Sequence, residues 1–411
     1  MANPPEYLTN EHPQAEAAED LASPFGEPAA KPAGVRFGAF GNEPFFRDAE
    51  FSLRPRLYYR YHDNGESIKE ALAIGGALDV TTGWWRDTLQ LGVTGYTTQP
   101  LAAPSDRGST GLLRPDGTGF SVLGQAWAKL RAGPATATLF RQELELPFIN
   151  ADDSRMIPNT FEAYRLDVKP SEVFRFGFAY VARMKDRTSA DFHPMSEIAG
   201  APGADRGTGV AGFVLGSERK SYLGAMDQWT FDLFNTVYVQ AGQSWKLTDD
   251  FALRGDVQFI DQRSVGDELI GRFDAQLYGA RLAASYRSAV LTLAFTDTEG
   301  ASIFHPFGGD PAFNSVIVSD FDQAGEKSYR IGLSYDFARL GLTGVEAFAS
   351  YAHGELPHGR SEDEVNATVD YRVADGPLKN LWLRLRYAHN SPSHAAATDE
   401  FRVILNYTFT F

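Results

Sequence analysis

Apolar and polar residues alternate with a period of two along most of the chain from about residue 45 onward. In the first such segment, Phe51, Leu53 and Leu57 share one parity, while Arg54 and Arg56 lie on the other. This period predicts a β-strand with two chemically different faces. The pattern recurs in about 18 segments, many of them roughly ten residues long. They lie near 51–62, 69–81, 84–96, 119–131, 135–142, 161–168, 173–184, 209–217, 220–230, 233–246, 250–262, 272–286, 289–298, 327–337, 345–354, 362–373, 380–390 and 400–411.

The connections between these segments are of two kinds. Some are tight turns, such as 249–250 and 287–288, and others are long and rich in Gly, Pro and Asp, such as 97–118, 185–208 and 299–326. Short turns that alternate with long loops are typical of outer-membrane barrels. We therefore predict an all-β fold, a transmembrane antiparallel β-barrel of about 18 strands whose long extracellular loops fold partly into the lumen.

Apolar and polar residues also alternate along the strands of a soluble β-sandwich, but there the buried face is apolar and the outer face is polar. Here the second parity is rich in Gly, Ser, Thr, Arg and Gln over hundreds of residues, which favours an apolar band facing lipid around a wet lumen. Backbone groups in lipid must all be paired, so the sheet has to close. About 18 strands predict a water-filled lumen narrowed by loops rather than a side-chain-packed core. Aromatic residues at strand ends, including Tyr96, Trp229 and Trp245, are expected at the membrane interfaces.

Composition narrows the class of protein further. The chain of 411 residues has no cysteine and a net charge of −15, which argues against a disulfide framework, a thiolate site or a nucleic-acid partner. No apolar run approaches the roughly 18 residues that a membrane helix needs. No signal peptide is visible, and we interpret the sequence as a form from which it was removed. Residues 1–44 form an acidic Pro/Ala-rich extension, expected to be disordered, with a small barrel plug as the alternative.

Arginine on the lumen parity is the sharpest functional signal. In a closed barrel the first and last strands are neighbours, so arginines from the two ends of the chain meet on one wall. A cationic wall in a narrow channel attracts anions, and guanidinium groups fit carboxylates in a bidentate manner. The alternative is that these arginines pair with lumen carboxylates or extend to the membrane rims. The predicted basic ladder comprises Arg54, Arg56, Arg60, Arg384, Arg386 and Arg402.

The remaining sequence motifs do not indicate a catalytic or ligand-binding site. The sequence GTGVAG at 207–212 matches a nucleotide-binding spacing without the strand–helix context that this function needs. A calcium-loop-like start at Asp320 and Asp322 lacks the closing glutamate, since Ile331 stands there. No HExxH or GxSxG motif occurs. We therefore expect no catalytic residues, no cofactor and no metal site. One segment does suggest a function, because 143–162 is amphipathic and punctuated by proline, as expected of a loop folded into the lumen.

Several stretches together resemble the OprD family of substrate-specific porins, also called outer-membrane carboxylate channels. They cover the chain from about Phe45 to Phe411, and the terminal Phe411 is similar to the signal read by the outer-membrane insertion machinery. The acidic extension at the N-terminus departs from the family pattern. The stretches are FFRDA (45–49), GSTGLL (108–113), LPFINADDSR (146–155), PNTFE (158–162), DLFNT (232–236), SDF (319–321), EKSY (326–329), GLSYDF (332–337), DGPLK (375–379), LRLR (383–386) and RVILNY (402–407).

The resemblance implies an 18-stranded barrel with a basic ladder and a constriction made by inward-folded loops. By position, the third loop would contribute Asp152, Asp153 and Arg155 to the constriction. The seventh loop would contribute Asn314, Ser315 and Asp320. Family members pass small carboxylates without energy input.

The expected function is a passive channel of the bacterial outer membrane for small, carboxylate-bearing polar solutes. Its other partners would be outer-membrane lipid and lipopolysaccharide, and the expected assembly is a monomer or a loose trimer. The alternative is a plugged transporter for hydrophobic ligands such as fatty acids, which would need an apolar pocket. An outer-membrane hydrolase would need a Ser/His constellation that the sequence lacks, and a sheath around a redox partner would need a wider barrel.

Overall fold

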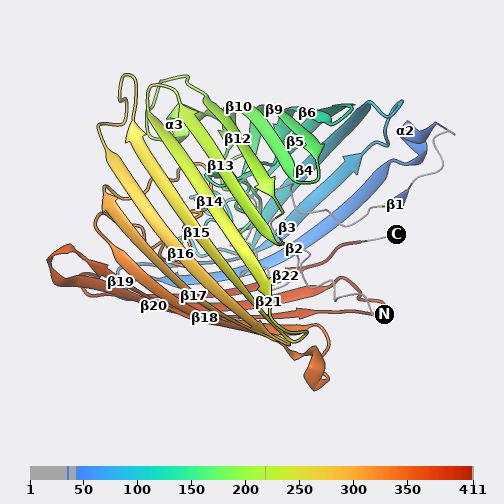
Figure 1. The fold of residues 1–411 in the computed structure, drawn as a ribbon. Helices are drawn as coiled ribbons and strands as arrows, with labels where there is room; N and C mark the ends of the chain where they lie inside the picture. The colour runs from blue at the N-terminus through green and yellow to red at the C-terminus, as the bar shows by residue number, and fades with distance from the viewer. Residues whose placement is uncertain (1–34, 37–42, 218, 410–411) are drawn as a thin grey trace.

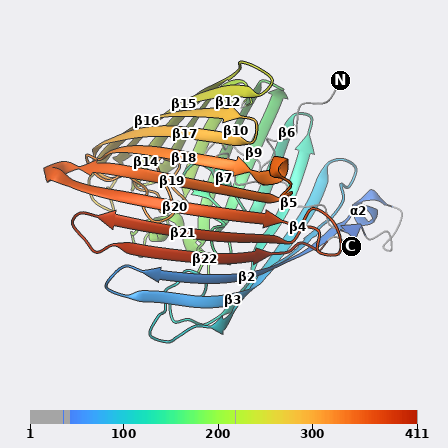
Figure 2. The ribbon, with the colours of Figure 1, turned by 90° about the horizontal axis from the view of Figure 1, so that it is seen from below.

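The computed structural model describes residues 35–36, 43–217 and 219–409. Within these residues, eighteen antiparallel strands form a closed barrel, with each strand paired to its neighbour in the chain and β22 paired to β2. Figure 1 shows the tilted strands from the side, and in Figure 2 the blue β2 lies beside the dark red β22 where the barrel closes. The antiparallel order places every long connection at the same end of the barrel.

The barrel strands are β2 (Glu50–Asp63), β3 (Ile68–Thr81), β4 (Leu89–Ala102), β5 (Phe120–Ala132), β6 (Ala135–Gln142), β9 (Thr160–Ser171), β10 (Phe174–Lys185), β12 (Thr208–Gly216), β13 (Ser221–Thr230), β14 (Phe234–Lys246), β15 (Phe251–Ser264), β16 (Asp274–Tyr286), β17 (Ala289–Gly300), β18 (Lys327–Asp336), β19 (Val345–Leu356), β20 (Arg360–Arg372), β21 (Trp382–Pro392) and β22 (Thr398–Asn406). The short elements are β1 (Val35–Arg36), α2 (Pro44–Arg47), β7 (Glu145–Leu146), β8 (Ile149–Asn150), β11 (His193–Pro194), α3 (Met195–Ile198), η3 (Phe337–Leu340) and η4 (Pro357–Gly359). None of the helices in the described residues is long and apolar enough to cross a membrane.

Each of the 18 predicted segments corresponds to one barrel strand. The largest difference is at 84–96, where the strand begins at Leu89 and continues to Ala102. Arg86 and Asp87 have φ angles of 49° and 57°, which make a turn before the strand. The last strand ends at Asn406, five residues earlier than predicted.

The alternating residues of each strand point alternately into the barrel and out towards the membrane. Along β13, for example, buried and exposed residues alternate at nearly every position. The outward residues are large and apolar, as a lipid-facing surface requires. They include Leu291, Leu293, Ile331, Leu333, Val365 and Val369. Tyr96 does not belong to this outer surface as predicted, because it points into the barrel, is 4% exposed and donates a hydrogen bond to Glu143.

Loop side chains fill part of the barrel interior. Two apolar clusters lie inside the barrel, where loop side chains pack against inward-facing wall residues. Phe148 and Phe307 from loops join the larger cluster, and Leu112 and Met156 join the smaller one. The strand pattern could not reveal these clusters because the loops supply much of their apolar surface.

The predicted extension at 1–44 lies mostly outside the described residues. Val35–Arg36 pairs with Phe51 and Glu50 at the start of the first barrel strand. The short helix α2 at Pro44–Arg47 then leads into that strand, which begins at Glu50.

Candidate functional site

The loop at 143–159 folds into the barrel, as its amphipathic sequence predicts. Its apolar residues Leu144, Leu146 and Phe148 are at most 3% exposed and pack in the larger apolar cluster. The Phe148 ring contacts the ring of Tyr238 edge-on, with the centroids 6.1 Å apart. The polar end of the loop, around Asp153, reaches the opposite wall of the barrel. The loop therefore crosses the lumen from the β14 side to the β2 side.

The loop at 301–326 is held by glutamines on the lumen face of β15. The Gln262 amide donates to the Phe304 carbonyl and accepts from the Phe304 N–H, both at 2.8 Å. Gln258 does the same with the Pro311 carbonyl at 3.1 Å and the Phe313 N–H at 2.8 Å. A glutamine side chain offers both a donor and an acceptor, so it can pair with backbone as a neighbouring strand would. These pairs fix the path of the loop across the lumen.

The far part of this loop is fastened to other strands. Asn314 is completely buried and donates to the Ser328 hydroxyl at 2.7 Å. The Glu364 carboxylate of β20 accepts from the backbone N–H groups of residues 317–319 at 2.9–3.3 Å. Ser315 donates to Asp320 at 2.6 Å within the loop. Of the predicted constriction residues in this loop, Asn314 thus anchors the loop to the wall, while Ser315 and Asp320 are partly exposed.

The predicted basic ladder is gathered on three neighbouring strands. In the sheet register, Arg402 of β22 lies directly opposite Arg60 of β2 on one side and Arg386 of β21 on the other. Arg56 lies opposite Asn406, and Arg384 lies opposite Ile404. Strands from the two ends of the chain, more than 300 residues apart in sequence, therefore form one wall of the barrel.

Carboxylates pair with ladder arginines on all three strands, as the ion pairs of Arg54, Arg56, Arg60, Arg384 and Arg402 show. The Arg54 guanidinium pairs with Asp79 at 2.8 Å, and that of Arg384 pairs with Asp370 at 2.9 Å. Both pairs lie within the wall. Arg56 instead pairs with Asp153 of the inward loop at 2.7 Å, so it also fastens that loop.

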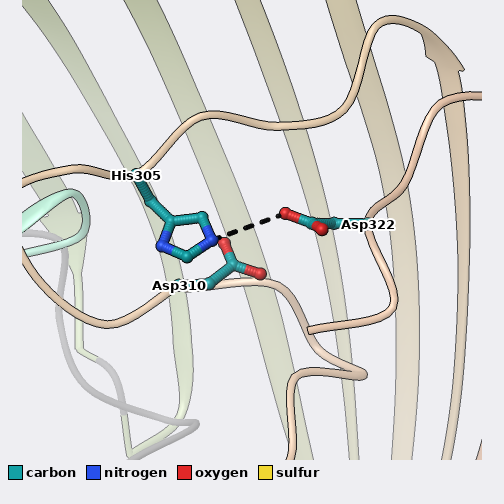
Figure 3. Close-up of side chains that lie close together, drawn as sticks. All are labelled: His305, Asp310 and Asp322. Atoms are coloured by element: carbon teal, nitrogen blue, oxygen red, sulfur yellow. Dashed lines mark ion pairs between the residues drawn. The ribbon is translucent and has the colours of Figure 1, made fainter. Parts of the chain in front are cut away.

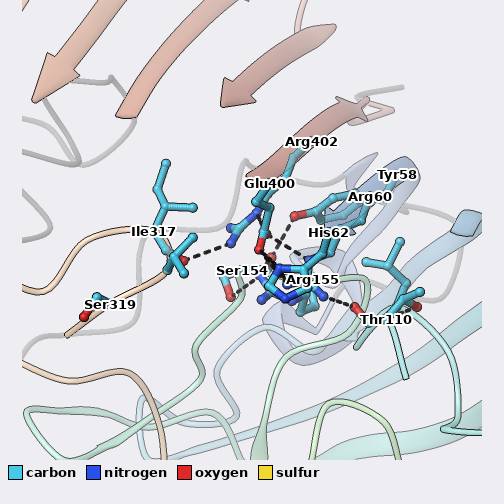
Figure 4. Close-up of polar contacts among 12 residues, drawn as sticks. Tyr58, Arg60, His62, Thr110, Ser154, Arg155, Ile317, Ser319, Glu400 and Arg402 are labelled. Carbon is cyan, nitrogen blue, oxygen red and sulfur yellow. Dashed lines mark hydrogen bonds and ion pairs between the residues drawn. The ribbon is translucent and has the colours of Figure 1, made fainter. Parts of the chain in front are cut away.

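The other two arginines share Glu400, which is 2% exposed. Arg60 donates to both oxygens of Glu400, at 2.9 and 2.7 Å, and Arg402 donates to one of them. The His62 ring nitrogen Nδ1 lies 2.9 Å from the same carboxylate. Figure 4 shows this cluster with Arg155 beside it. One carboxylate therefore serves two guanidinium groups and an imidazole.

Arg155 comes from the inward loop rather than the wall. Its guanidinium donates to the Ser154 carbonyl at 3.0 Å, and among the described residues no carboxylate lies within ion-pair distance of it. The nearby acidic residues of the loop are taken by other arginines, Asp153 by Arg56 and Asp152 by Arg187, the latter at 2.6 Å. Burial and repulsion from Arg402 and Arg60 lower the pKa of Arg155 to about 9, so it stays protonated at neutral pH.

Comparison with known proteins agrees with this barrel. Residues 43–411 match the model of the outer membrane porin, OprD family. The chain belongs to the OprD family of outer-membrane porins.

Relatives of this OprD-family porin are found in Pseudomonas. Porin D of Pseudomonas aeruginosa is 24% identical, with 88% of this chain and 91% of that protein aligned. The crystal structure of P. aeruginosa OccK9 (OpdG) has a TM-score of 0.83 and 27% identity over 89% of this chain and 100% of its own. Two further structures from P. aeruginosa are each 22% identical to this chain. OpdK with vanillate has a TM-score of 0.80 and covers 89% of this chain and 99% of its own. OccK2 (OpdF) in complex with glucuronate has a TM-score of 0.79 and covers 90% of this chain and 100% of its own. This OprD-family porin is therefore a small-solute channel of the bacterial outer membrane.

Sequence reasoning missed the acidic and amide partners of this porin's constriction. Glu400 could have been found, because it stands two positions before Arg402 and therefore on the same face of its strand. Gln258 and Gln262 share the lumen face of β15 for the same reason, but nothing in the pattern indicates which loop they hold. Glu364 gave no signal, since its partners are backbone amides of a loop far away in sequence.

Replacing Glu364 with glutamine is expected to loosen the loop at 301–326. The side chain is completely buried, and an amide would turn an NH2 group towards donors that now meet a carboxylate. The unfolding free energy is expected to fall by about 1.5–3 kcal/mol, the contribution of one hydrogen bond to a charged group. Urea unfolding and the rate of proteolysis within 301–326 would measure it. Glu355→Gln, on the exposed end of β19, is the matched control, and equal losses in both variants would contradict the anchoring role.

Proposed function

We propose that this porin is a passive, anion-preferring channel for small carboxylate-bearing solutes, and that the carboxylate passes over Arg155. The observation that carries the proposal is the charge balance around this residue. Arg155, Arg60 and Arg402 supply three guanidinium groups, while Glu400 is the carboxylate that pairs with the latter two. An anion at Arg155 would relieve the repulsion among these groups.

Guanidinium chemistry supports a carboxylate rather than an anion in general. The planar guanidinium presents two parallel N–H donors that match the two oxygens of a carboxylate. In a narrow channel with low-dielectric walls, such fixed charges also raise the local concentration of the passing anion. Arg54 and Arg384, which pair with carboxylates within the wall, would place further guanidinium groups along the path.

The ligands of two structural relatives support the same solute class. Vanillate, present with OpdK, and glucuronate, in complex with OccK2, each carry one carboxylate on a ring that bears at least one hydroxyl group. The alternative of a hydrophobic-ligand transporter finds less support here. In the described part of the chain, the buried apolar side chains inside the barrel pack against one another in two clusters at 0–8% exposure.

Single-channel recording of the Arg155→Gln variant tests the proposal. The wild type is expected to show an anion-preferring reversal potential in a planar bilayer across a KCl gradient. In the variant we expect this potential to shift towards zero, and block by an added aromatic carboxylate such as benzoate to weaken. Arg287→Gln, in a turn at the opposite end of the barrel, should leave both unchanged.

Two results would count against the proposal. An unchanged reversal potential in Arg155→Gln would leave a general porin whose arginines are structural. The absence of any conductance in the wild type would instead favour a plugged transporter.

A further inference from the structure

The loop at 301–326 also brings together an imidazole and three carboxylates. One ligand atom each from His305, Asp310 and Asp322 lies within 4.8 Å of the others. His305 Nε2 is 3.8 Å from Asp322 Oδ2 and 3.5 Å from Oδ2 of Asp320. Figure 3 shows the first three side chains converging from separate turns of the loop. This group is distinct from the arginine wall on β2, β21 and β22.

Oxygen atoms of two carboxylates in this group, those of Asp310 and Asp322, lack the partners that burial normally requires. Asp322 is 7% exposed, and its Oδ2 accepts no hydrogen bond within the described residues. Both carboxylate oxygens of Asp310 are likewise shielded from solvent. The backbone amide of Ala312 interacts with this carboxylate, but the contact falls short of a well-formed hydrogen bond. Buried carboxylates are normally hydrogen-bonded, paired with a cation or bound to a metal. His305 alone would balance at most one of these charges.

We propose that His305, Asp310 and Asp322 bind a divalent first-row transition metal, with Zn2+ as the best match. One imidazole nitrogen and two carboxylates are a donor set that Zn2+ accepts, whereas Ca2+ and Mg2+ take oxygen ligands. Asp320 or a water molecule would complete four-coordination. In a tetrahedral site the ligand atoms lie roughly 3.3–3.6 Å apart, so ligand atoms that are now up to 4.8 Å apart need to approach by at most about 1.5 Å.

The ligand spacing explains why the sequence did not indicate a metal site. The calcium-like start at Asp320 requires all its ligands within twelve consecutive residues, and the last of these positions is occupied by Ile331 instead of glutamate. Here His305 and Asp310 come from the opposite side of the loop, and the backbone path fixed by Gln258 and Gln262 brings them to Asp322.

The competing explanation for this group is protonation. Burial, together with the charges of Asp310 and Asp320, raises the pKa of Asp322 to about 9. Burial and the charge of Asp320 also raise the pKa of Asp310 well above its ordinary value. In the absence of metal, the Asp322 carboxyl would therefore hold a proton at neutral pH. Metal binding must displace this proton, so the affinity for Zn2+ is expected to increase as the pH rises.

The metal would have a structural consequence for the constriction. Between Asp310 and Asp322 lies the segment whose Ile317 carbonyl accepts from Arg402 and whose amides are bound by Glu364. A cation that joins the two ends of this segment would hold it in the lumen.

Isothermal titration of the full chain with ZnCl2 tests the proposal. The protein should carry no histidine tag, should be folded in detergent and should be stripped of metal with EDTA. We expect one saturable Zn2+ site per chain, with weaker binding of CaCl2. Affinity for Zn2+ should fall by at least about 10-fold in His305→Ala and in Asp322→Asn, since even outer-shell partners of metal ligands account for roughly 10–100-fold. Zn2+ should also slow proteolysis within 301–326 in the wild type and not in these variants.

His389→Ala is the matched control, because His389 pairs with Asp399 at 2.9 Å but belongs to no three-ligand group in the described part of the chain. It should bind Zn2+ as the wild type does. The proposal is overturned if the wild type binds no more Zn2+ than His305→Ala, or if His389→Ala loses binding to the same extent. Heat-dependent gel mobility checks that each variant is folded. If Asp322→Asn does not fold, His305→Ala alone tests the proposal.

Discussion

Replacing Glu400 with alanine is expected to lower the unfolding free energy by about 3–5 kcal/mol, the cost of leaving buried charges without their partner. Arg60 and Arg402 are 8% and 3% exposed, and both donate to this carboxylate. Without it, two guanidinium groups and the His62 ring would face one another. Urea-induced unfolding in lipid vesicles, followed by tryptophan fluorescence, would measure the loss.

The same change should also alter the channel. Removing one negative charge beside Arg155 is expected to strengthen the anion preference in the reversal-potential experiment, the opposite of Arg155→Gln. Glu299→Ala is the control, because Glu299 is exposed at the end of β17 and should cost no more than about 0.5 kcal/mol. A second test is Glu400→Ala combined with Arg402→Met, which should recover part of the stability because it removes one unpaired charge. Equal stability of Glu400→Ala and wild type would show that the cluster is not held by this carboxylate.

Phe148→Ala is expected to lower the unfolding free energy by about 3–5 kcal/mol and to raise single-channel conductance. The ring is 1% exposed and packs against Tyr238, so its loss leaves a cavity under the inward loop. The loop would then hold its polar end, with Asp153 and Arg155, less firmly against the opposite wall. Urea unfolding and planar-bilayer recording would give the two values.

Phe178→Ala separates loss of loop packing from loss of apolar surface in general. Phe178 lies on the outer face of β10 and is 53% exposed to the membrane side. Its replacement should leave conductance unchanged even if stability falls. If both variants have the wild-type conductance, the 143–159 loop does not limit the passage.

The barrel could be predicted from the sequence because its rules are local. Strand periodicity needs only neighbouring residues, and all 18 segments were found from it. The family resemblance agrees with the matched model over 43–411. Errors arose where backbone conformation changed within a few residues, as at Arg86 and Asp87 before β4.

The constriction was predictable in part. The amphipathic 143–162 segment predicted an inward loop, and closure of the barrel predicted that Arg56, Arg60 and Arg402 would meet. Asp153 was not predictable as a partner of Arg56, because loop folding brings the two together. Glu400 could be placed on the face of Arg402 from their spacing, but its contact with Arg60 depends on the strand register. The apolar clusters under the loops were also missed, because each contact joins a strand residue to a loop residue and the strand pattern does not show where the loop lies.

The sequence alone thus determined the strand count, the two faces of the wall and the meeting of its two ends, because periodicity and closure follow from lipid and backbone hydrogen bonding. Only the tertiary structure decided the path of the two inward loops. That path depends on long-range contacts, such as those of Gln258 and Glu364 with backbone groups more than 40 residues away. It distinguishes Arg155 from the ion-paired arginines around it, and it brings His305 to Asp322.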